Sequence, residues 1–138
     1  MGLVILFFLN STFNLLISFS GFAISSTEGR CAMEYLGGAS GNKGFVFKCH
    51  RTNREQPGQQ PAKVEIVHPV NVIEFNRKYG TFATGGGDGK VNIWDGENKK
   101  RICQLQKFPT SISSLSFSNS GDKLAIAVSY TFEEGEKE

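Results

Sequence analysis

The sequence contains few of the residues from which metal and catalytic sites are built. It has two histidines and three cysteines in 138 residues. Cys31, Cys49 and Cys103 are odd in number and lack the spacing of metal ligands, which predicts buried, reduced thiols of an intracellular protein. His68 has no second His or Cys at ligand spacing, so no metal site is expected. Cys49 and His50 are neighbours on a predicted strand and point to opposite faces, so they cannot form a nucleophile–base pair.

Excess charge of either sign is also missing. Fifteen basic and thirteen acidic residues give a net charge of +2, which does not indicate direct binding of nucleic acid. Sixteen glycines and an aromatic content of 12% suit many short strands joined by tight turns. The length allows at most one ordinary domain.

Residues 1–20 differ from the rest of the chain, because no charged residue precedes Glu28. They have the length of a signal peptide or a short membrane span, but lack a basic start and a small-residue cleavage site. A glycosylation sequon at residues 10–12 interrupts the apolar run. Three interpretations remain open: a non-native N-terminus joined to a truncated reading frame, a signal or anchor, and a buried hydrophobic segment. Contact with a membrane is not expected unless this lead inserts.

The most informative stretch is residues 81–95, TFATGGGDGKVNIWD. An apolar run, a glycine-rich acidic turn and an alternating strand predict a β-hairpin, with the turn at residues 86–89. The turn is not a phosphate-binding loop, because it joins two strands and no Lys-Ser/Thr follows it. Asp88 is placed to accept hydrogen bonds from amides within the turn.

The stretch recurs along the chain. FAISSTEGR at residues 22–30 precedes FATGGGDGK at 82–90 by 60 positions, and Val70, Ile73 and Phe75 recur 42 positions later as Ile112, Leu115 and Phe117. A repeat near 42 residues is typical of a four-stranded propeller blade.

The motif resembles a WD-repeat blade. In that family a His, a strand Ser/Thr, a turn Asp and the Trp form a buried hydrogen-bonded tetrad, because a buried indole N–H and a buried carboxylate each need a partner. By resemblance, these positions are His68, Thr84, Asp88 and Trp94, with His68 lying 26 residues before Trp94.

The predicted fold is all-β: a partial WD-repeat β-propeller of about two and a half to three four-stranded blades. We expect a lead at 1–20, a degenerate blade with strands b–d at 21–50, a polar loop at 51–64, a complete WD blade at 65–107, and an incomplete blade (strands a–b) with an acidic tail at 108–138. Propellers use four to eight blades, so we expect that this chain does not close alone.

Longer motifs carry a more specific resemblance. EGR at residues 28–30, FKCHR at 47–51 and PTSIS at 109–113 resemble the C-terminal part of the Bub-type mitotic checkpoint WD-repeat family, and the FEEGEK ending is similar to plant members. FKCHR is shared with the Rae-type mRNA-export propeller, a nuclear-pore-associated alternative. A secreted or membrane-anchored β-domain is a third hypothesis, which depends on residues 1–20 being a real signal.

The resemblance implies a non-enzymatic scaffold without a cofactor or small-molecule substrate, here as a truncated copy. Its family binds GLEBS-type segments of checkpoint kinases (Bub-type and Mad-type proteins) and brings them to kinetochores. Location in the nucleus is expected, with the cytoplasm as an alternative. Family arginines meet acidic residues of these segments, and Arg30 and Arg51 match them. Lys99 and Arg101 could extend the basic surface. For all four, the alternative is a solvated charge.

Overall fold

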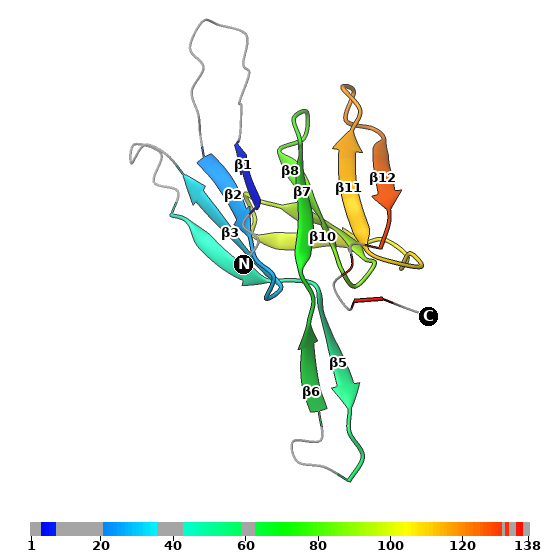
Figure 1. Ribbon diagram of the computed structural model, residues 1–138. Coiled ribbons are helices and arrows are strands. Elements are labelled where there is room, and N and C mark those ends of the chain that lie inside the picture. Colours follow the sequence, from blue (N-terminus) through cyan, green and yellow to red (C-terminus); the bar gives the residue numbers. More distant parts are fainter. Residues whose placement is uncertain are drawn as a thin grey trace, which may run out of the picture.

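The computed structural model describes residues 4–7, 21–35, 43–58, 63–130, 132, 135 and 136, and these residues form strands and turns only (Figure 1). The predicted all-β class is therefore confirmed. Within these ranges no helix is long and apolar enough to cross a membrane. The predictions for the greater part of the lead and for most of the acidic tail concern residues outside the described part.

Two four-stranded antiparallel sheets and one two-stranded sheet lie side by side. The first sheet contains β1 (Val4–Phe7), β2 (Gly21–Ser25), β3 (Arg30–Tyr35) and β4 (Phe45–Lys48). The second contains β7 (Val70–Asn76), β8 (Thr81–Gly86), β9 (Val91–Asp95) and β10 (Lys100–Gln104). The third contains β11 (Ile112–Phe117) and β12 (Leu124–Val128). Strands β1 and β2 contact β7, and β11 contacts β7 and β8, which gives the arrangement of a partial propeller.

The loop predicted at residues 51–64 is partly wrong. Arg51–Glu55 forms strand β5 and Lys63–Val67 forms strand β6, and the two pair as an antiparallel hairpin. This hairpin extends away from the three sheets (Figure 1). Strand β5, RTNRE, has no apolar residue, and the alternation of Val64 and Ile66 in β6 is too short to predict a hairpin by itself.

The 60-residue repeat is visible in the strand register. Phe22 lies opposite Glu34 in the first sheet, as Phe82 lies opposite Trp94 in the second. The turns before β3 and β9 both contain a glycine with positive φ, 62° at Gly29 and 72° at Gly89. A β-carbon at Gly89 would lie 2.7 Å from the Phe108 carbonyl oxygen, so only glycine fits that turn.

The lead provides one described strand, β1, which pairs with β2. Phe7 lies opposite Phe22, and Phe75 lies opposite Phe82 in the second sheet. The sequence VILF of β1 thus has the register of VIEF at residues 72–75. The sequence does not predict this strand, because residues 1–20 lack the turn glycines and charges of the repeats.

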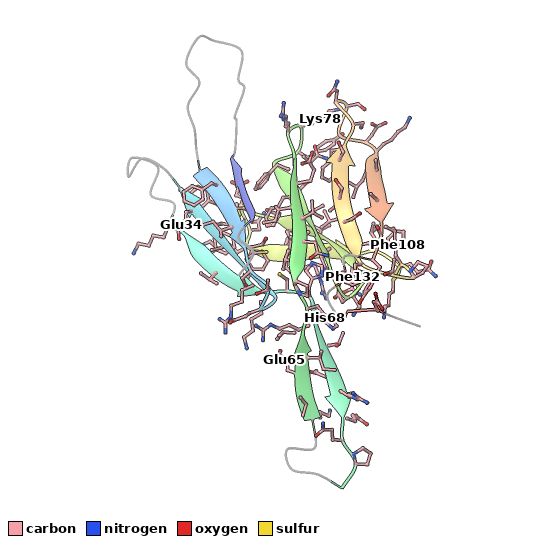
Figure 2. All side chains as sticks on the ribbon, in the orientation of Figure 1. Glu34, Glu65, His68, Lys78, Phe108 and Phe132 are labelled. Atoms are coloured by element: carbon pink, nitrogen blue, oxygen red, sulfur yellow. The ribbon has the colours of Figure 1, made fainter. Side chains whose placement is uncertain are left out.

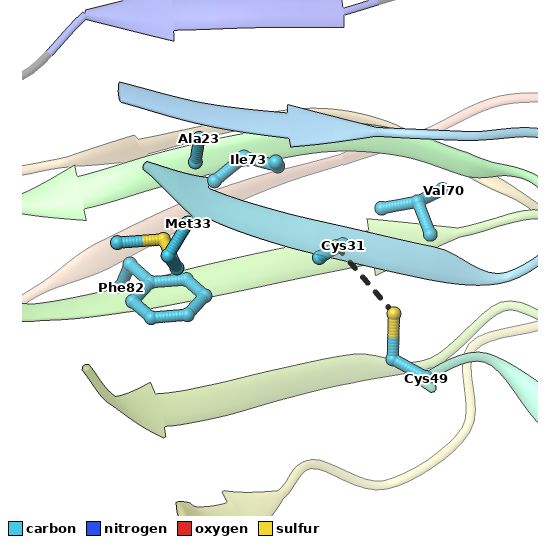
Figure 3. Packing of buried hydrophobic residues seen from close by; sticks show 7 residues of the cluster. All are labelled: Ala23, Cys31, Met33, Cys49, Val70, Ile73 and Phe82. Atoms are coloured by element: carbon cyan, nitrogen blue, oxygen red, sulfur yellow. Dashed lines mark hydrogen bonds between the residues drawn. The ribbon is translucent and has the colours of Figure 1, made fainter. Parts of the chain in front are cut away.

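Two apolar clusters hold the three sheets together. One lies between the first and second sheets and contains Ala23, Cys31, Met33, Cys49, Val70, Ile73 and Phe82 (Figure 3). The other lies between the second and third sheets and contains Ala83, Val91, Ile112 and Leu115. Each sheet therefore stabilises its neighbour through side chains that leave water.

The cysteines differ from the prediction in one respect. Cys31 and Cys49 are free and buried, with their sulfur atoms 3.5 Å apart, whereas Cys103 is exposed on β10. A dashed line marks the contact between Cys31 and Cys49 in Figure 3. The hydrogen bond with Cys49, together with burial, raises the pKa of the Cys31 thiol far above its usual range. Cys31 is therefore held as a neutral thiol in the core.

Candidate partner-binding site

A basic cavity of about 220 Å³ lies where the end of β4, the base of the β5–β6 hairpin and strands β9 and β10 meet. The charged side chains that line it, apart from the buried Asp88, are Lys48, Arg51, Glu65, Lys90 and Arg101. We call this the basic cavity. Four cations against one exposed carboxylate make it suited to an acidic ligand group.

Arg51 is held in place by the backbone of the turn before β3. Its Nε donates to the Gly29 carbonyl oxygen at 3.3 Å, and its Nη2 donates to the Glu28 carbonyl oxygen at 2.9 Å. Its Nη1 donates to Oε2 of Glu65 at 2.5 Å. Only 12% of the side chain is exposed. The guanidinium is therefore preorganised, with Nη1 directed at a carboxylate.

Arg101 lies on β10 and enters the same cavity. Its Nη1 is 3.5 Å from Oδ1 of Asn92 and 3.3 Å from Oε1 of Gln104. Both are neutral acceptors, and the residue is exposed, so its charge is not neutralised by these contacts. The structure thus brings together Arg51 and Arg101, which are 50 positions apart in the sequence.

Lys99 and Arg30 lie elsewhere. The Lys99 ammonium sits 5.1 Å from the centre of the Phe45 ring, at the start of β4, whereas the cavity lies beyond the end of that strand. Arg30 is exposed at the start of β3, where it pairs with Lys48, but it does not line the cavity. Lys99 is therefore separate from the cavity, and Arg30 flanks it.

The buried histidine that lines this cavity is His50, and the prediction of His68 for the tetrad is wrong. Nδ1 of His50 is 2.8 Å from Oδ1 of Asp88, and Nε2 is 2.9 Å from Oγ1 of Thr84. The indole Nε1 of Trp94 donates to the same Thr84 oxygen at 2.9 Å. Thr84, Asp88 and Trp94 are thus linked as expected, but through a different histidine.

The directions of these hydrogen bonds follow from the groups involved. The Trp94 indole is only a donor, so the Thr84 oxygen accepts from it and directs its own hydrogen at Nε2 of His50. Nδ1–H of His50 then donates to the Asp88 carboxylate. These hydrogen bonds connect the segment after β4 to β8, to the β8–β9 turn and to β9. They therefore hold the end of the first sheet against the second sheet.

Asp88 is the charged member of this network. Burial acts to raise its pKa, but the hydrogen bond and electrostatic attraction of His50, with the Lys90 amide, outweigh it and leave the pKa below the ordinary 3.8. Oδ1 also accepts from the Lys90 backbone N–H at 3.1 Å. The carboxylate is therefore ionised at neutral pH and fixes the turn that carries Lys90 to the basic cavity.

The distance of His68 from Trp94 suits a blade without insertions, which is why the spacing predicts this histidine. The β5–β6 hairpin is inserted between His50 and β7, and it returns the chain almost to its starting point: the His68 N–H donates to the His50 carbonyl oxygen at 3.0 Å. Nε2 of His68 is 3.2 Å from Oγ1 of Thr52 instead. The signal for His50 was its place two residues after β4, the last strand of the first sheet.

Within the described ranges no cluster of His, Cys, Asp and Glu could hold a metal ion. The cavity's chemistry is that of charge pairing and hydrogen bonding.

Similarity to known proteins is extensive along this chain but covers only part of them. The chain is 58% identical to the mitotic checkpoint protein BUB3.1 of Arabidopsis thaliana over 120 residues, which are 86% of this chain and 33% of that protein. It is 52% identical to the mitotic checkpoint protein bub3 of Dictyostelium discoideum, over 86% of this chain and 34% of that protein. The mRNA export factor GLE2 of Chaetomium thermophilum is 38% identical, over 83% of this chain and 30% of that protein.

Two further comparisons, with protein-family models and with solved structures, show less similarity. No protein-family model matches the chain. The solved β-propeller domain of Cps50 (Swd1) from Myceliophteria thermophila aligns with a TM-score of 0.41 at 13% identity, over 80% of this chain and 46% of that one. The chain spans about a third of the length of the curated relatives that it matches.

Proposed function

The chain is homologous, over most of its length, to part of the Bub3-type mitotic checkpoint proteins, and from this premise we propose that it is part of a non-enzymatic scaffold of the spindle assembly checkpoint. In this role it binds acidic, GLEBS-type segments of checkpoint kinases and brings them to kinetochores, with a location in the nucleus during mitosis. The basic cavity is the contact site for the acidic residues.

The observation that carries the proposal is the convergence of Arg51 and Arg101 in one cavity with Lys48 and Lys90. An arginine pairs with a carboxylate through two parallel hydrogen bonds, which gives both strength and orientation. Arg51 is already oriented by two backbone carbonyl groups, so binding costs little ordering of its side chain. Arg30, beside the cavity, is placed to meet a segment that continues along the start of β3.

The mRNA-export role is the second candidate. Its relatives share 36–38% identity with this chain, whereas the checkpoint proteins from the plant, the slime mould and the nematode share 52–58%. The small net charge of +2 does not favour a role that depends on RNA contact. These observations support the checkpoint role over the mRNA-export role in our proposal.

The proposal is tested by calorimetric titration of the full chain with a synthetic GLEBS-type peptide. We expect binding that Arg101→Gln weakens by about tenfold or more, because a charge-assisted hydrogen bond contributes about 1.5–3 kcal/mol. Lys99→Gln removes the same charge outside the cavity and should change the affinity by less than about twofold.

A second peptide, with each Glu and Asp replaced by Gln and Asn, serves as the ligand control and should not bind measurably. Equal loss of affinity in the two variants would mean that net charge alone attracts the peptide. Absence of binding to the wild-type chain and to both variants would contradict the proposed function.

A further inference from the structure

Glu65 is the one exposed carboxylate among the charged residues that line the basic cavity. It lies on β6, opposite Asn53, and Figure 2 shows it near the base of the hairpin. Its Oε2 accepts from Nη1 of Arg51 at 2.5 Å and is 3.9 Å from Nζ of Lys48. The carboxylate thus occupies the position that an acidic group of a partner would take.

The two members of this pair differ in freedom. The Arg51 side chain is 12% exposed and keeps two hydrogen bonds, to the Glu28 and Gly29 carbonyl groups, that do not depend on Glu65. The Glu65 side chain is 44% exposed and stands on a hairpin that projects from the sheets. Glu65 can therefore rotate into water while Arg51 stays in place.

From these contacts we infer that Glu65 is an intramolecular competitor, which occupies the arginine until a partner carboxylate displaces it. The inference rests on the proposed binding function and adds its regulation. An incoming acidic segment has to break the Arg51–Glu65 pair before it forms its own pair with Arg51. It therefore gains less binding free energy than it would from an unoccupied arginine. A segment that offers only a single, poorly placed carboxylate gains nothing over Glu65, so the competitor also sharpens selectivity.

The hairpin supplies a matched control in Glu55. This residue lies on β5, and its Oε1 is 4.0 Å from Nζ of Lys63, with side-chain exposures of 77% and 70%. It does not line the basic cavity. Glu55→Gln therefore changes the charge of the same hairpin by the same amount, without releasing an arginine.

The test is titration of the wild-type chain, Glu65→Gln and Glu55→Gln with the GLEBS-type peptide. We expect Glu65→Gln to tighten binding by about tenfold, since a charge-assisted pair no longer has to be broken. Glu55→Gln should differ from wild type by less than about twofold. Unchanged or weaker binding by Glu65→Gln, while wild type binds, would overturn this inference and leave the proposed function standing.

A measurement on the free protein makes the two failures separable. The side-chain Nε–H resonance of Arg51 should move in Glu65→Gln and stay in place in Glu55→Gln, with thermal unfolding curves that overlap. If the Arg51 resonance does not respond to Glu65→Gln, the competitor contact is absent and the inference fails, whatever the peptide does. If it responds but no variant binds the peptide, the proposed function fails.

Discussion

The two four-stranded sheets have the same register but different polar cores. In the second sheet, Thr84 and Trp94 take part in the hydrogen-bond chain that ends at Asp88. In the first sheet, 60 positions earlier, these residues are Ile24, Glu34 and Glu28. Phe22 nevertheless pairs with Glu34 as Phe82 pairs with Trp94. The turn glycines and the alternation of apolar residues are therefore sufficient for the register, and the tetrad has another task.

That task is to join the sheets. The histidine of the chain comes from the segment after β4 of the first sheet, while its partners belong to the second. Trp94 also packs on Phe47 of β4, with ring centres 4.6 Å apart. The residue that follows the histidine is Arg51, so the lock between the sheets also sets the position of the basic cavity's best-held cation.

The largest difference between the sheets should appear in how the stability of variants depends on pH. Because the pKa of Asp88 is lowered by folding, its ionisation contributes stability above the unfolded value of about 3.8, and this is lost as the pH falls through the folded pKa. We expect Asp88→Asn to reduce the free energy of unfolding by about 2–3 kcal/mol near neutral pH, with a gap to wild type that narrows below about pH 4.

Urea unfolding of both proteins at several pH values measures this gap. Glu28→Gln, the equivalent change in the first sheet, is the control, because Glu28 is exposed; its gap should be small at every pH. A gap for Asp88→Asn that stays constant with pH would show that its carboxylate titrates as in the unfolded chain.

A smaller effect on stability should distinguish residue 94 of the second sheet from the equivalent residue 34 of the first sheet. Trp94→Phe keeps an aromatic ring against Phe47 but removes the indole donor to Thr84, and should lower stability by about 1 kcal/mol. Glu34→Trp places the missing indole in the first sheet, where Ile24 offers no acceptor, and should change stability by less than about 0.5 kcal/mol. Urea unfolding of both variants measures these changes in the free energy of unfolding. A clear increase in stability from Glu34→Trp would mean that packing alone stabilises the indole.

Much of this architecture could be predicted from the sequence, because apolar alternation and turn glycines are local signals. Strands at residues 70–75, 81–86 and 91–95 follow from such patterns, as does the all-β class. The hairpin formed by β5 and β6 could not be predicted in this way, since β5 has no apolar residue and the apolar alternation of β6 is short. The prediction of His68 for the tetrad is wrong because of the same hairpin. A spacing rule assumes that nothing is inserted, whereas the hairpin adds residues to the chain without adding distance between its two ends.

The cavity could be predicted only in part. Arg51 and Arg101 were singled out by resemblance, but their convergence depends on how β10 packs beside the segment after β4. Lys99, two residues from Arg101, has a positive φ of 53° in the turn between β9 and β10, and its ammonium lies over the Phe45 ring instead of among the residues that line the cavity. Glu65 carried no signal, since a single glutamate on a polar stretch resembles a solvated charge.

The central claim is that His50, and not His68, links the two sheets through Asp88, and a double-mutant cycle tests it most directly. His50→Ala alone should cost about 3–5 kcal/mol, because it leaves the buried Asp88 charge without its partner, whereas His68→Ala should cost about 1 kcal/mol. In urea unfolding, the coupling energy between His50→Ala and Asp88→Ala should be about 1–3 kcal/mol. The effects of His68→Ala and Asp88→Ala should add to within about 0.5 kcal/mol. Additivity for His50 together with coupling for His68 would contradict the account.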